Sequence, residues 1–435
     1  MRSRYIVRVI TVDLPMPGGP VRSQARVVED NPITLLLGGL KCFTSERRRV
    51  PPKLKSVVEG KTRLLVPPAS LWSKVPETYP VFFNPAARLN RDISVAVAAA
   101  TGPATFLDLL SATGARGVRV AREAGDPVRV TMVDFNRASL SVAAKNVKAN
   151  HLEERCEVVH SEANRYLYSR FEREEKFDAV DVDPFGTPAP YLQAALVASK
   201  DGAVLSFTAT DAAVLCGVYP EVALRRYGAA APRSEFVHET AIRILAGFAA
   251  RMGGINDIGV APLAAHSTLH YFRVYVRVVR GARASDESQR YLGYVTQCNG
   301  CQSRFGGEVQ VQRCPRCGKK VRPAGPLWLG PLCDDKVLKD STQFCDGEGW
   351  RDSAEMVSSL RGTDEFPPFS YSVERSASRQ GVSSVPLDAL LETLSSAGYR
   401  STRQPFESLS VKTDAAVEAF DDAVRETSRA LAKAD

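Results

Sequence analysis

The sequence predicts an α/β fold built on a parallel sheet, with a smaller α+β region toward the carboxyl end. Apolar, strand-like runs alternate with helical patterns between residues 105 and 209, as in parallel strands joined by right-handed crossovers. Gly114 and Gly117 follow the first run, as in a nucleotide-binding βα turn. The fourth run, 177–182, stops abruptly at Asp-Pro-Phe-Gly, residues 183–186. Because proline cannot continue a strand ladder, this strand should lift an acid and an aromatic ring to the sheet edge.

The remaining elements follow from the same periodicities. Residues 55–66 alternate as two short strands around Gly60, and 93–100 form an alanine-rich helix. The parallel strands are expected at 105–110, 128–133, 157–159, 177–182 and 203–209, separated by helices at about 115–124, 137–150, 163–171 and 188–199. A helix is expected at 238–252. The runs 255–261 and 268–279 have no helix between them, so they should form a hairpin at the sheet edge.

The length of 435 residues suggests two or three domains. Residues 1–52 show no sustained periodicity, and we interpret them either as a disordered basic arm or as sequence upstream of a misplaced start. Residues 53–280 should form the α/β domain and 281–435 a second domain. Within the second domain, the patterns at 386–397 and 413–434 resemble the helices of a small helix-plus-wing unit.

Composition limits the class of protein. The chain has 57 Lys and Arg residues against 49 Asp and Glu, a net charge of +8, which favours a polyanionic partner. No apolar run approaches the roughly 20 residues of a membrane span. Four of the nine cysteines form two Cys-x-x-Cys pairs, which indicates a metal site in a reducing compartment rather than a disulfide framework. We therefore expect a cytoplasmic monomer with no membrane association and no obligate protein partner.

The first two strands predict a cofactor site. Gly114 and Gly117 would let the backbone approach a ligand closely, with Asp108 just upstream. Asp134 ends the second strand, where an acid typically accepts hydrogen bonds from ribose hydroxyls. Together these residues indicate an adenosine-containing cofactor. A nicotinamide-binding domain would look similar at the glycine turn, and Asp134 could instead cap the helix that begins near Arg137.

The end of the fourth strand favours transfer to a ring amine. An exocyclic amine is a poor nucleophile because its lone pair is delocalised into the ring. Asp183 and the carbonyl of Pro184 could accept hydrogen bonds from its N–H groups, and Phe185 could stack on the base once it leaves its helix. Asp183 could also act as the general base.

Several separated motifs then resemble one family, the tRNA (guanine26-N2)-dimethyltransferases, in archaeal-type form. They are Asn-Pro-x-x-Arg-Leu-Asn-Arg-Asp at 84–92, Leu-Leu-Ser-Ala-Thr-Gly-Ala-Arg-Gly at 109–117, Asp-Val-Asp-Pro-Phe-Gly at 181–186, His-Ser-Thr-Leu-His-Tyr-Phe-Arg-Val-Tyr at 266–275, Leu-Trp-Leu-Gly-Pro at 327–331 and Val-Lys-Thr-Asp at 411–414. The similarity runs from about residue 53 to the end of the chain.

The resemblance implies a class I, Rossmann-like methyltransferase that uses S-adenosylmethionine. It should methylate N2 of guanine 26 in tRNA, first once and then twice. By the same resemblance, Arg91 and Arg116 would bind the methionyl carboxylate, Asp134 the ribose, and Glu162 with Ala163 the adenine. Asp183 would be the catalytic carboxylate, and Phe82 with Phe185 would sandwich the guanine.

The paired cysteines predict a structural zinc ribbon at about 291–320. Cys298, Cys301, Cys314 and Cys317 have the spacing of a tetrahedral four-thiolate site. A redox function would need only one pair, and a closed site leaves no position for a catalytic water.

Two clusters of cations are the expected tRNA-binding surface, because phosphate contacts must hold the RNA while the base leaves its stack. They are Arg316, Lys319, Lys320 and Arg322 on the ribbon and Arg400, Arg403 and Lys412 near the wing. His266 and His270 are expected to be structural rather than catalytic.

Three other functions are considered. Adenine N6 methyltransferases acting on DNA or RNA usually have a second proline after the acid-proline pair, whereas here Phe185 follows Pro184 directly. A non-catalytic tRNA-binding protein with a vestigial methyltransferase domain would not need both Asp134 and Asp183. A nicotinamide oxidoreductase would not need the Asp-Pro-Phe sequence.

Overall fold

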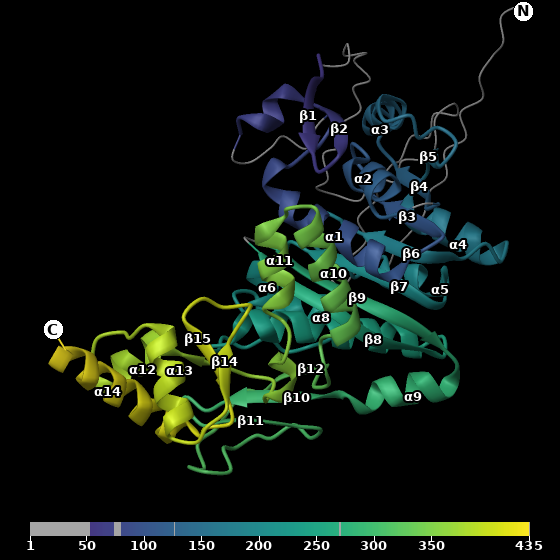
Figure 1. The fold of residues 1–435 in the computed structure, drawn as a ribbon. Helices are drawn as coiled ribbons and strands as arrows, with labels where there is room; N and C mark the ends of the chain where they lie inside the picture. Colours follow the sequence, from purple (N-terminus) through teal and green to yellow (C-terminus); the bar gives the residue numbers. More distant parts are fainter. Residues whose placement is uncertain (1–52, 74–79, 126, 269–270, 435) are drawn as a thin grey trace, which may run out of the picture. The chain divides into compact units, whose positions relative to one another are not determined.

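The computed structural model describes residues 53–73, 80–125, 127–268 and 271–434 (Figure 1). The predictions for residues 1–52 and for His270 lie outside the described residues.

A seven-stranded sheet is the centre of the fold. Its strands are β3 (Thr105–Leu109), β4 (Arg129–Asp134), β5 (Cys156–His160), β6 (Phe177–Val182), β7 (Ser199–Ala209), β8 (Ile258–Thr268) and β9 (Tyr271–Arg280). They are arranged in the order β5-β4-β3-β6-β7-β9-β8. The first five are parallel, and β9 is antiparallel to both of its neighbours. The predicted α/β sheet and its edge hairpin are therefore confirmed, although β7 begins at Ser199 rather than at residue 203.

The helices associated with this sheet are α1 (Arg88–Thr101), α2 (Ala115–Glu123), α3 (Arg137–Ala149), α4 (Ala163–Glu172), α5 (Leu192–Val197), α6 (Ala212–Leu215), α7 (Pro220–Tyr227) and α8 (Val237–Gly254). Helix α5 is shorter than predicted. Pro188 and Pro190 precede it, and the segment they occupy forms turns.

Both faces of the sheet are buried. Successive strand residues point to opposite faces, and neighbours in each strand enter different hydrophobic clusters. Phe106, Met132 and Ala179 pack in one cluster, which also includes residues of α2 and α3, whereas Leu107, Val133 and Val180 pack in the other, which includes residues of α4, α5 and α8. This double burial explains why the strands appear in the sequence as nearly continuous apolar runs.

The hairpin of β1 (Lys55–Glu59) and β2 (Thr62–Val66) is docked on α3 by two asparagines. Asn146 accepts from the Leu65 amide at 2.6 Å and donates to the Leu65 carbonyl at 3.2 Å. Asn150 does the same for Arg63, at 3.0 and 2.7 Å. One turn apart on the helix, the two amides satisfy the free edge of β2 as a neighbouring strand would. The short helices η1 (Pro68–Leu71) and η2 (Pro85–Ala87) follow the hairpin.

The region after the sheet begins with α9 (Ala282–Arg290) and a three-stranded antiparallel sheet of β10 (Leu292–Gln297), β11 (Arg304–Gly307) and β12 (Ala324–Trp328). Helices α10 (Asp335–Gly347) and α11 (Arg351–Ser358) come next. The sequence patterns did not predict α10. Helix α10 packs on α1, and Cys345, Trp350 and Ala354 enter the same hydrophobic cluster as α2 and α3.

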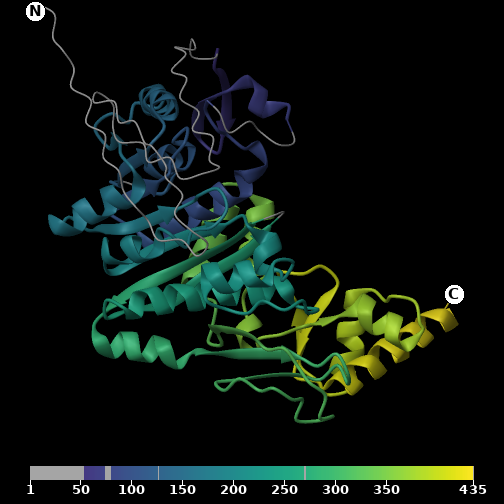
Figure 2. The same cartoon turned by 180° about the vertical axis from the view of Figure 1, so that it is seen from behind.

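The chain ends in a small unit with its own core. It contains η3 (Thr363–Glu365), β13 (Tyr371–Ser372), α12 (Val373–Gln380), α13 (Leu387–Ser396), β14 (Ser401–Arg403), β15 (Ser410–Thr413) and α14 (Val417–Ala434). The strands are arranged in the order β13-β15-β14, and α12 and α13 lie along α14 (Figure 2). We call the β14–β15 hairpin the wing. No described helix is long and apolar enough to cross a membrane. The division at residue 280 stays a prediction.

Candidate active site and cysteine cluster

The strand order reverses between β3 and β6, and this switch point is where open α/β sheets bind ligands, outside the carboxyl ends of the strands. The loop after β3 has unusual backbone geometry there. Leu110 and Ala112 have φ values of 64° and 47°, in the left-handed region that residues other than glycine rarely adopt. Such conformations concentrate at functional sites, because the surrounding structure must hold them.

Asp183 lies at this switch point and forms an ion pair with Arg116. The Arg116 side chain is buried, whereas that of Asp183 is partly exposed. Arg116 also donates to Asn90 Oδ1 at 2.8 Å and lies 3.2 Å from Asp181 Oδ1. Burial alone would raise the pKa of Asp183, but Arg116 and then Arg273 outweigh it and hold that pKa below its usual range. Asp183 is therefore a carboxylate at neutral pH, well suited to accept hydrogen bonds and poorly suited to take up a proton.

A network of buried charged residues lies next to Asp183 within the sheet. Asp181 is fully buried in β6 and pairs with Arg273 of β9 and with Ser206 at 2.8 Å. Arg273 also donates to Tyr275 Oη at 2.8 Å and to Thr208 at 2.6 Å. The position of Asp183 is thus set through β6, β7 and β9 together.

Asp108 lies beside Asp181 in the β3–β6 register and accepts from the Gly117 amide at 2.9 Å. Burial, followed by repulsion from Asp181, raises the pKa of Asp108 to about 7. Gly114 is the N-cap of α2 and has a φ of 70°, and a Cβ there would lie 2.7 Å from Met132 Sδ. A Cβ at Gly117 would likewise meet Met132, at 2.8 Å. Within the described residues, these two glycines therefore allow α2 to pack closely on β4.

Asp134 ends β4 with its carboxylate shared between two loops. Its Oδ2 accepts from the Ala112 amide at 2.8 Å, and its Oδ1 accepts from the Asn136 amide at 2.7 Å. The side chain that caps α3 belongs to Asn136, so the alternative that Asp134 is the helix cap is wrong. Asp134 is only half-buried, and its oxygens retain lone pairs for further donors.

Phe135, which follows Asp134, is 71% exposed and stacks on His160 with ring centroids 5.8 Å apart. The sequence interpretation missed this ring, although an aromatic residue directly after an acid at a strand end was the available signal.

The other residues predicted to bind the cofactor have contacts within the protein. Glu162 caps α4, accepting from the Asn164 and Arg165 amides at 3.0 and 2.8 Å, and Ala163 is buried as the first residue of that helix. Arg91 is buried against Glu59, to which it donates at 2.8 and 2.6 Å. Arg91 therefore connects α1 to the β1–β2 hairpin.

The two aromatic rings expected around the guanine are in contact with each other. Phe82 and Phe185 meet edge to face, with centroids 4.7 Å apart and planes at 83°. Phe185 is 63% exposed, whereas Pro184 is buried. A base could enter between the rings only if one of them turned away. The loop itself is anchored, since the Gly186 amide donates to Thr210 Oγ1 at 2.7 Å.

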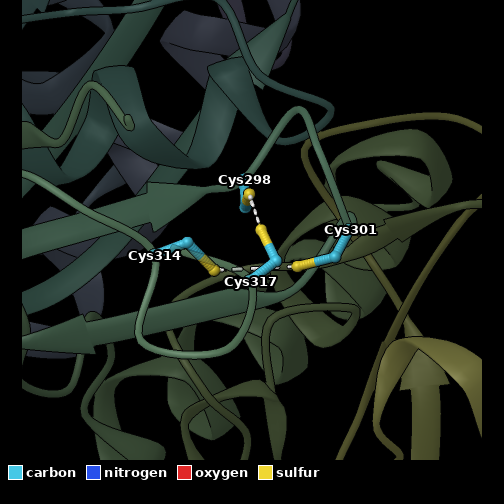
Figure 3. Close-up of side chains that lie close together, drawn as sticks. All are labelled: Cys298, Cys301, Cys314 and Cys317. Atoms are coloured by element: carbon cyan, nitrogen blue, oxygen red, sulfur yellow. Dashed lines mark hydrogen bonds between the residues drawn. The ribbon is translucent and has the colours of Figure 1, made fainter. Parts of the chain in front are cut away.

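The cysteine cluster consists of Cys298, Cys301, Cys314 and Cys317 (Figure 3). All four sulfur atoms lie within 4.8 Å of one another, and the closest pairs are 3.5 and 3.6 Å apart. The first pair lies in the turn between β10 and β11, and the second lies in the loop before β12. A tetrahedral ion with bonds of about 2.3 Å places its ligands about 3.8 Å apart, so the cluster has the size of a mononuclear metal site.

Comparison with known proteins decides the family. Residues 60–425 match the model of the N2,N2-dimethylguanosine tRNA methyltransferases. The chain belongs to this family. It is 34% identical over 382 residues to the tRNA (guanine(26)-N(2))-dimethyltransferase of Methanosarcina acetivorans, covering 83% of this chain and 96% of that protein. The Methanopyrus kandleri enzyme of the same name is 35% identical over 85% of this chain and 96% of its own length.

A solved structure supports the same assignment. Trm1 from Pyrococcus horikoshii, determined with S-adenosyl-L-methionine, superposes with a TM-score of 0.74 at 31% identity, covering 85% of this chain and 99% of that one. The resemblance inferred from the motifs is confirmed, and so is the methyltransferase sheet that it implied.

The structure also locates the cations expected to bind tRNA in this family member. Lys412 is 2% exposed and pairs with Glu239 of α8 at 2.7 Å, so the prediction that it lies on a positive surface is wrong. All four residues of β15 are buried, so the strand shows no alternation of apolar and polar residues from which the burial of Lys412 could have been predicted. Arg400 and Arg403 are exposed but paired with Asp414 and Asp388, respectively.

His266 is buried and is not a candidate base. Burial, followed by the charges of Arg273 and Arg116, lowers its pKa to about 3. The sequence interpretation also missed Asp181 and Arg273, although a charge inside an apolar strand requires a partner and was therefore a usable signal.

Proposed function

We propose that this protein transfers methyl groups from S-adenosylmethionine to N2 of a guanine in tRNA, at position 26, first once and then twice. One observation carries the proposal. Asp183, Pro184 and Phe185 form an anchored loop at the switch point, beside the strained turn 110–112. Family membership supplies the substrate class, since the relatives named above are tRNA (guanine(26)-N(2))-dimethyltransferases.

The residues at the carboxyl ends of β3 and β4 fit an adenosine cofactor. Asp134 would accept from ribose hydroxyls, Phe135 would stack on the adenine, and Glu162 with Ala163 would border the ring. When bound, S-adenosylmethionine supplies an electrophilic methyl group. Arg91 and Arg116 remain the candidates for its carboxylate, but both already bind carboxylates of the protein.

The low pKa of Asp183 supports a role as a hydrogen-bond acceptor. A carboxylate at the edge of the sheet, with the Pro184 carbonyl beside it in the chain, would accept from the amine N–H groups and so orient the nitrogen lone pair. An alkylated ring amine is a strong acid and releases its proton to water readily. We therefore assign to Asp183 orientation of the amine rather than proton abstraction.

The cysteine cluster is proposed to hold one structural zinc ion. Four thiolates without an open coordination position are typical of zinc sites that stabilise folds. The cluster joins the turn after β10 to the loop before β12. Among the described residues, the backbone hydrogen bonds of these two segments, such as those from the Cys298 amide to the Ser303 carbonyl and from the Cys314 amide to the Lys319 carbonyl, stay within each segment.

The ribbon offers the better-placed cations for tRNA phosphates. Lys319, Lys320 and Arg322 are exposed, and none has a side-chain partner among the residues that the structure describes. Arg316, in contrast, pairs with Glu418 of α14. A cytoplasmic location and a monomeric state stay predictions.

The deciding experiment is incubation of the purified protein with an unmodified tRNA transcript and isotopically labelled S-adenosylmethionine, followed by nucleoside mass spectrometry. We expect label in N2-methylguanosine and N2,N2-dimethylguanosine, both lost when guanine 26 is replaced by adenine. Label in N6-methyladenosine would establish the alternative methyltransferase. Binding of tRNA without any transfer would establish the non-catalytic alternative.

A further inference from the structure

A large cavity lies away from the candidate active site, between the first cysteine turn and α12. Its volume is about 780 Å³, within the roughly 300–1,000 Å³ of typical ligand pockets. Residues from three separate segments line it. They are Arg233, Ser234 and Glu235 before α8, Gln297, Asn299 and Gln302 around the cysteine turn, and Glu374, Arg375, Ser378 and Arg379 on α12. We call it the ribbon–α12 cavity.

The charged side chains that line this cavity leave a net positive charge, because Arg233, Arg375 and Arg379 outnumber Glu235 and the exposed Glu374. Glu235 is neutralised twice, by Arg304 and by Arg379 at 2.7 Å. Arg233 and Arg375 are exposed, and their guanidinium groups have no hydrogen-bond or ion-pair partner within the described residues. Each can present a full set of donors to an anionic group. Guanidinium groups suit phosphate oxygens because the pairing can be bidentate.

The opposite wall carries amide groups in a fixed orientation. Gln297 accepts from the Glu235 amide at 2.8 Å and donates to Gln302 Oε1 at 3.0 Å. Gln302 in turn donates to the Asn299 carbonyl at 3.2 Å, and its backbone is held at a φ of 60°. The Asn299 side chain has no partner among the described residues and is exposed. Aligned amides of this kind can hydrogen-bond the edge of a nucleobase.

The cysteine cluster supports this wall. Asn299 and Gly300 lie between Cys298 and Cys301, so the shape of the turn follows from the cluster. The stem of Lys319 packs over Gly300, where any Cβ would clash with it.

We propose that the ribbon–α12 cavity binds one unpaired nucleotide of the tRNA substrate. Its phosphate would lie on Arg233 and Arg375, and its base edge would face Asn299 and the two glutamines. The volume exceeds what a phosphate ion alone would fill, and combined guanidinium and amide groups suit a nucleotide better than a simple anion. The proposal rests on the proposed tRNA substrate and adds a second contact, distinct from the loop at Asp183.

The first test compares tRNA binding by Arg233→Ala/Arg375→Ala with that by Arg173→Ala. Arg173 is also an exposed arginine, but it follows α4 at the edge of the sheet opposite the candidate site. In a filter-binding salt titration the double variant should bind roughly tenfold more weakly and lose about one to two from the slope of log K against log salt. Replacing the same pair by lysine should restore most of the slope. Affinity and slope equal to those of Arg173→Ala would overturn the proposal.

The second test locates the contact directly. Transcripts containing 4-thiouridine should photo-crosslink to peptides that contain residues 297–302 or 373–380, and Asn299→Ala should change which uridine crosslinks. Crosslinks only elsewhere would overturn the assignment. Neither test uses methyl transfer. If the protein methylated tRNA normally but made none of these contacts, only the proposal that the cavity binds a nucleotide would be refuted. If it crosslinked as expected but did not methylate, only the proposed function would be refuted.

Discussion

Arg116, the second residue of α2, pairs with Asp183, which follows β6, and so joins the two loops that diverge at the switch point. The sequence interpretation assigned the arginine to the cofactor and the acid to the base. In the structure they bind each other, with Asp181 as a second acid beside the guanidinium. Any ligand carboxylate that approached Arg116 would compete with Asp183, so the charge state and position of the candidate catalytic acid depend on this arginine.

Replacing Asp183 should lower turnover without weakening cofactor binding. Asp183→Ala removes a hydrogen-bond acceptor for the amine, and the expected loss is roughly 10²–10³-fold in kcat. Asp183→Asn keeps one acceptor oxygen and should retain more activity than the alanine variant. Calorimetry with S-adenosylmethionine should show binding at least as tight as the parent's for both variants, because Arg116 no longer pairs with Asp183, and weaker binding to Asp134→Ala. Unchanged turnover in Asp183→Ala would remove Asp183 from the mechanism.

Phe135 and Phe185 should each affect the binding of a different substrate. Phe135→Ala should weaken S-adenosylmethionine binding by about 1–3 kcal/mol through lost stacking, with KM for tRNA unchanged. Phe185→Ala should instead raise KM for tRNA or lower kcat, with cofactor affinity unchanged. Equilibrium dialysis and initial-rate measurements on both variants test this pairing. If both substitutions changed the same parameter, the assignment of the rings to different substrates would be wrong.

Asp108 should make stability depend on pH. Because its pKa is raised to about 7 in the folded state, the folded protein keeps a proton that the unfolded chain releases near its ordinary value of 3.8. The stabilising contribution is full below about pH 4 and is lost as the pH rises toward 7. Between pH 5 and pH 8, the free energy of unfolding measured with urea should fall by about 2–3 kcal/mol more for the parent than for Asp108→Asn. An identical difference between the two proteins at both pH values would contradict this.

Two basic residues of the wing should differ in their effect on stability. Lys412→Met leaves Glu239 buried with one cation fewer and should lower the free energy of unfolding by about 3 kcal/mol. Arg403→Met breaks an exposed pair with Asp388 and should change it by less than about 1 kcal/mol. Denaturant melts of both variants provide the comparison. Similar small effects would show that the Glu239 pair contributes little.

Metal analysis should find one zinc ion per chain in protein purified without chelator. Cys301→Ser should lower the melting temperature before it affects methyl transfer, because the cluster lies away from Asp183 and serves the fold. Cys333→Ser is a suitable control, since its thiol is half-buried and belongs to no group of metal-ligating residues among those described. Protein with no stoichiometric metal and parent-like stability would refute the zinc site.

The strands were predictable because both faces of the sheet are buried, and uninterrupted apolar runs such as 177–182 leave few alternatives. The position of Asp183 was also predictable, since its strand must end before Pro184. The sequence could not reveal what Asp183 contacts. Arg116 and Arg273 come from α2 and β9, and only the folded sheet brings them to one carboxylate.

Other features were hidden for related reasons. Helix α10 has a mixed polar pattern, and the face it buries is evident only against α1. Asn146 and Asn150 look like ordinary surface asparagines in the sequence, so their paired contacts with β2 could not be predicted. Lys412 looked exposed because lysine usually is, yet Glu239 on α8 stabilises its charge in the interior.

The packing of α10 and α11 on the methyltransferase helices has a consequence for synthesis on the ribosome. Val95 and Ala96 of α1 share a hydrophobic cluster with Trp350 and Ala354. Domains generally fold as they emerge, amino-terminal part first. Here the sheet, α2 and α3 cover one part of that cluster early, and the part that Trp350 and Ala354 cover stays open until residue 354 has left the exit tunnel. The growing chain therefore exposes apolar side chains of α1 during much of its synthesis. A chaperone that binds apolar segments could bind there.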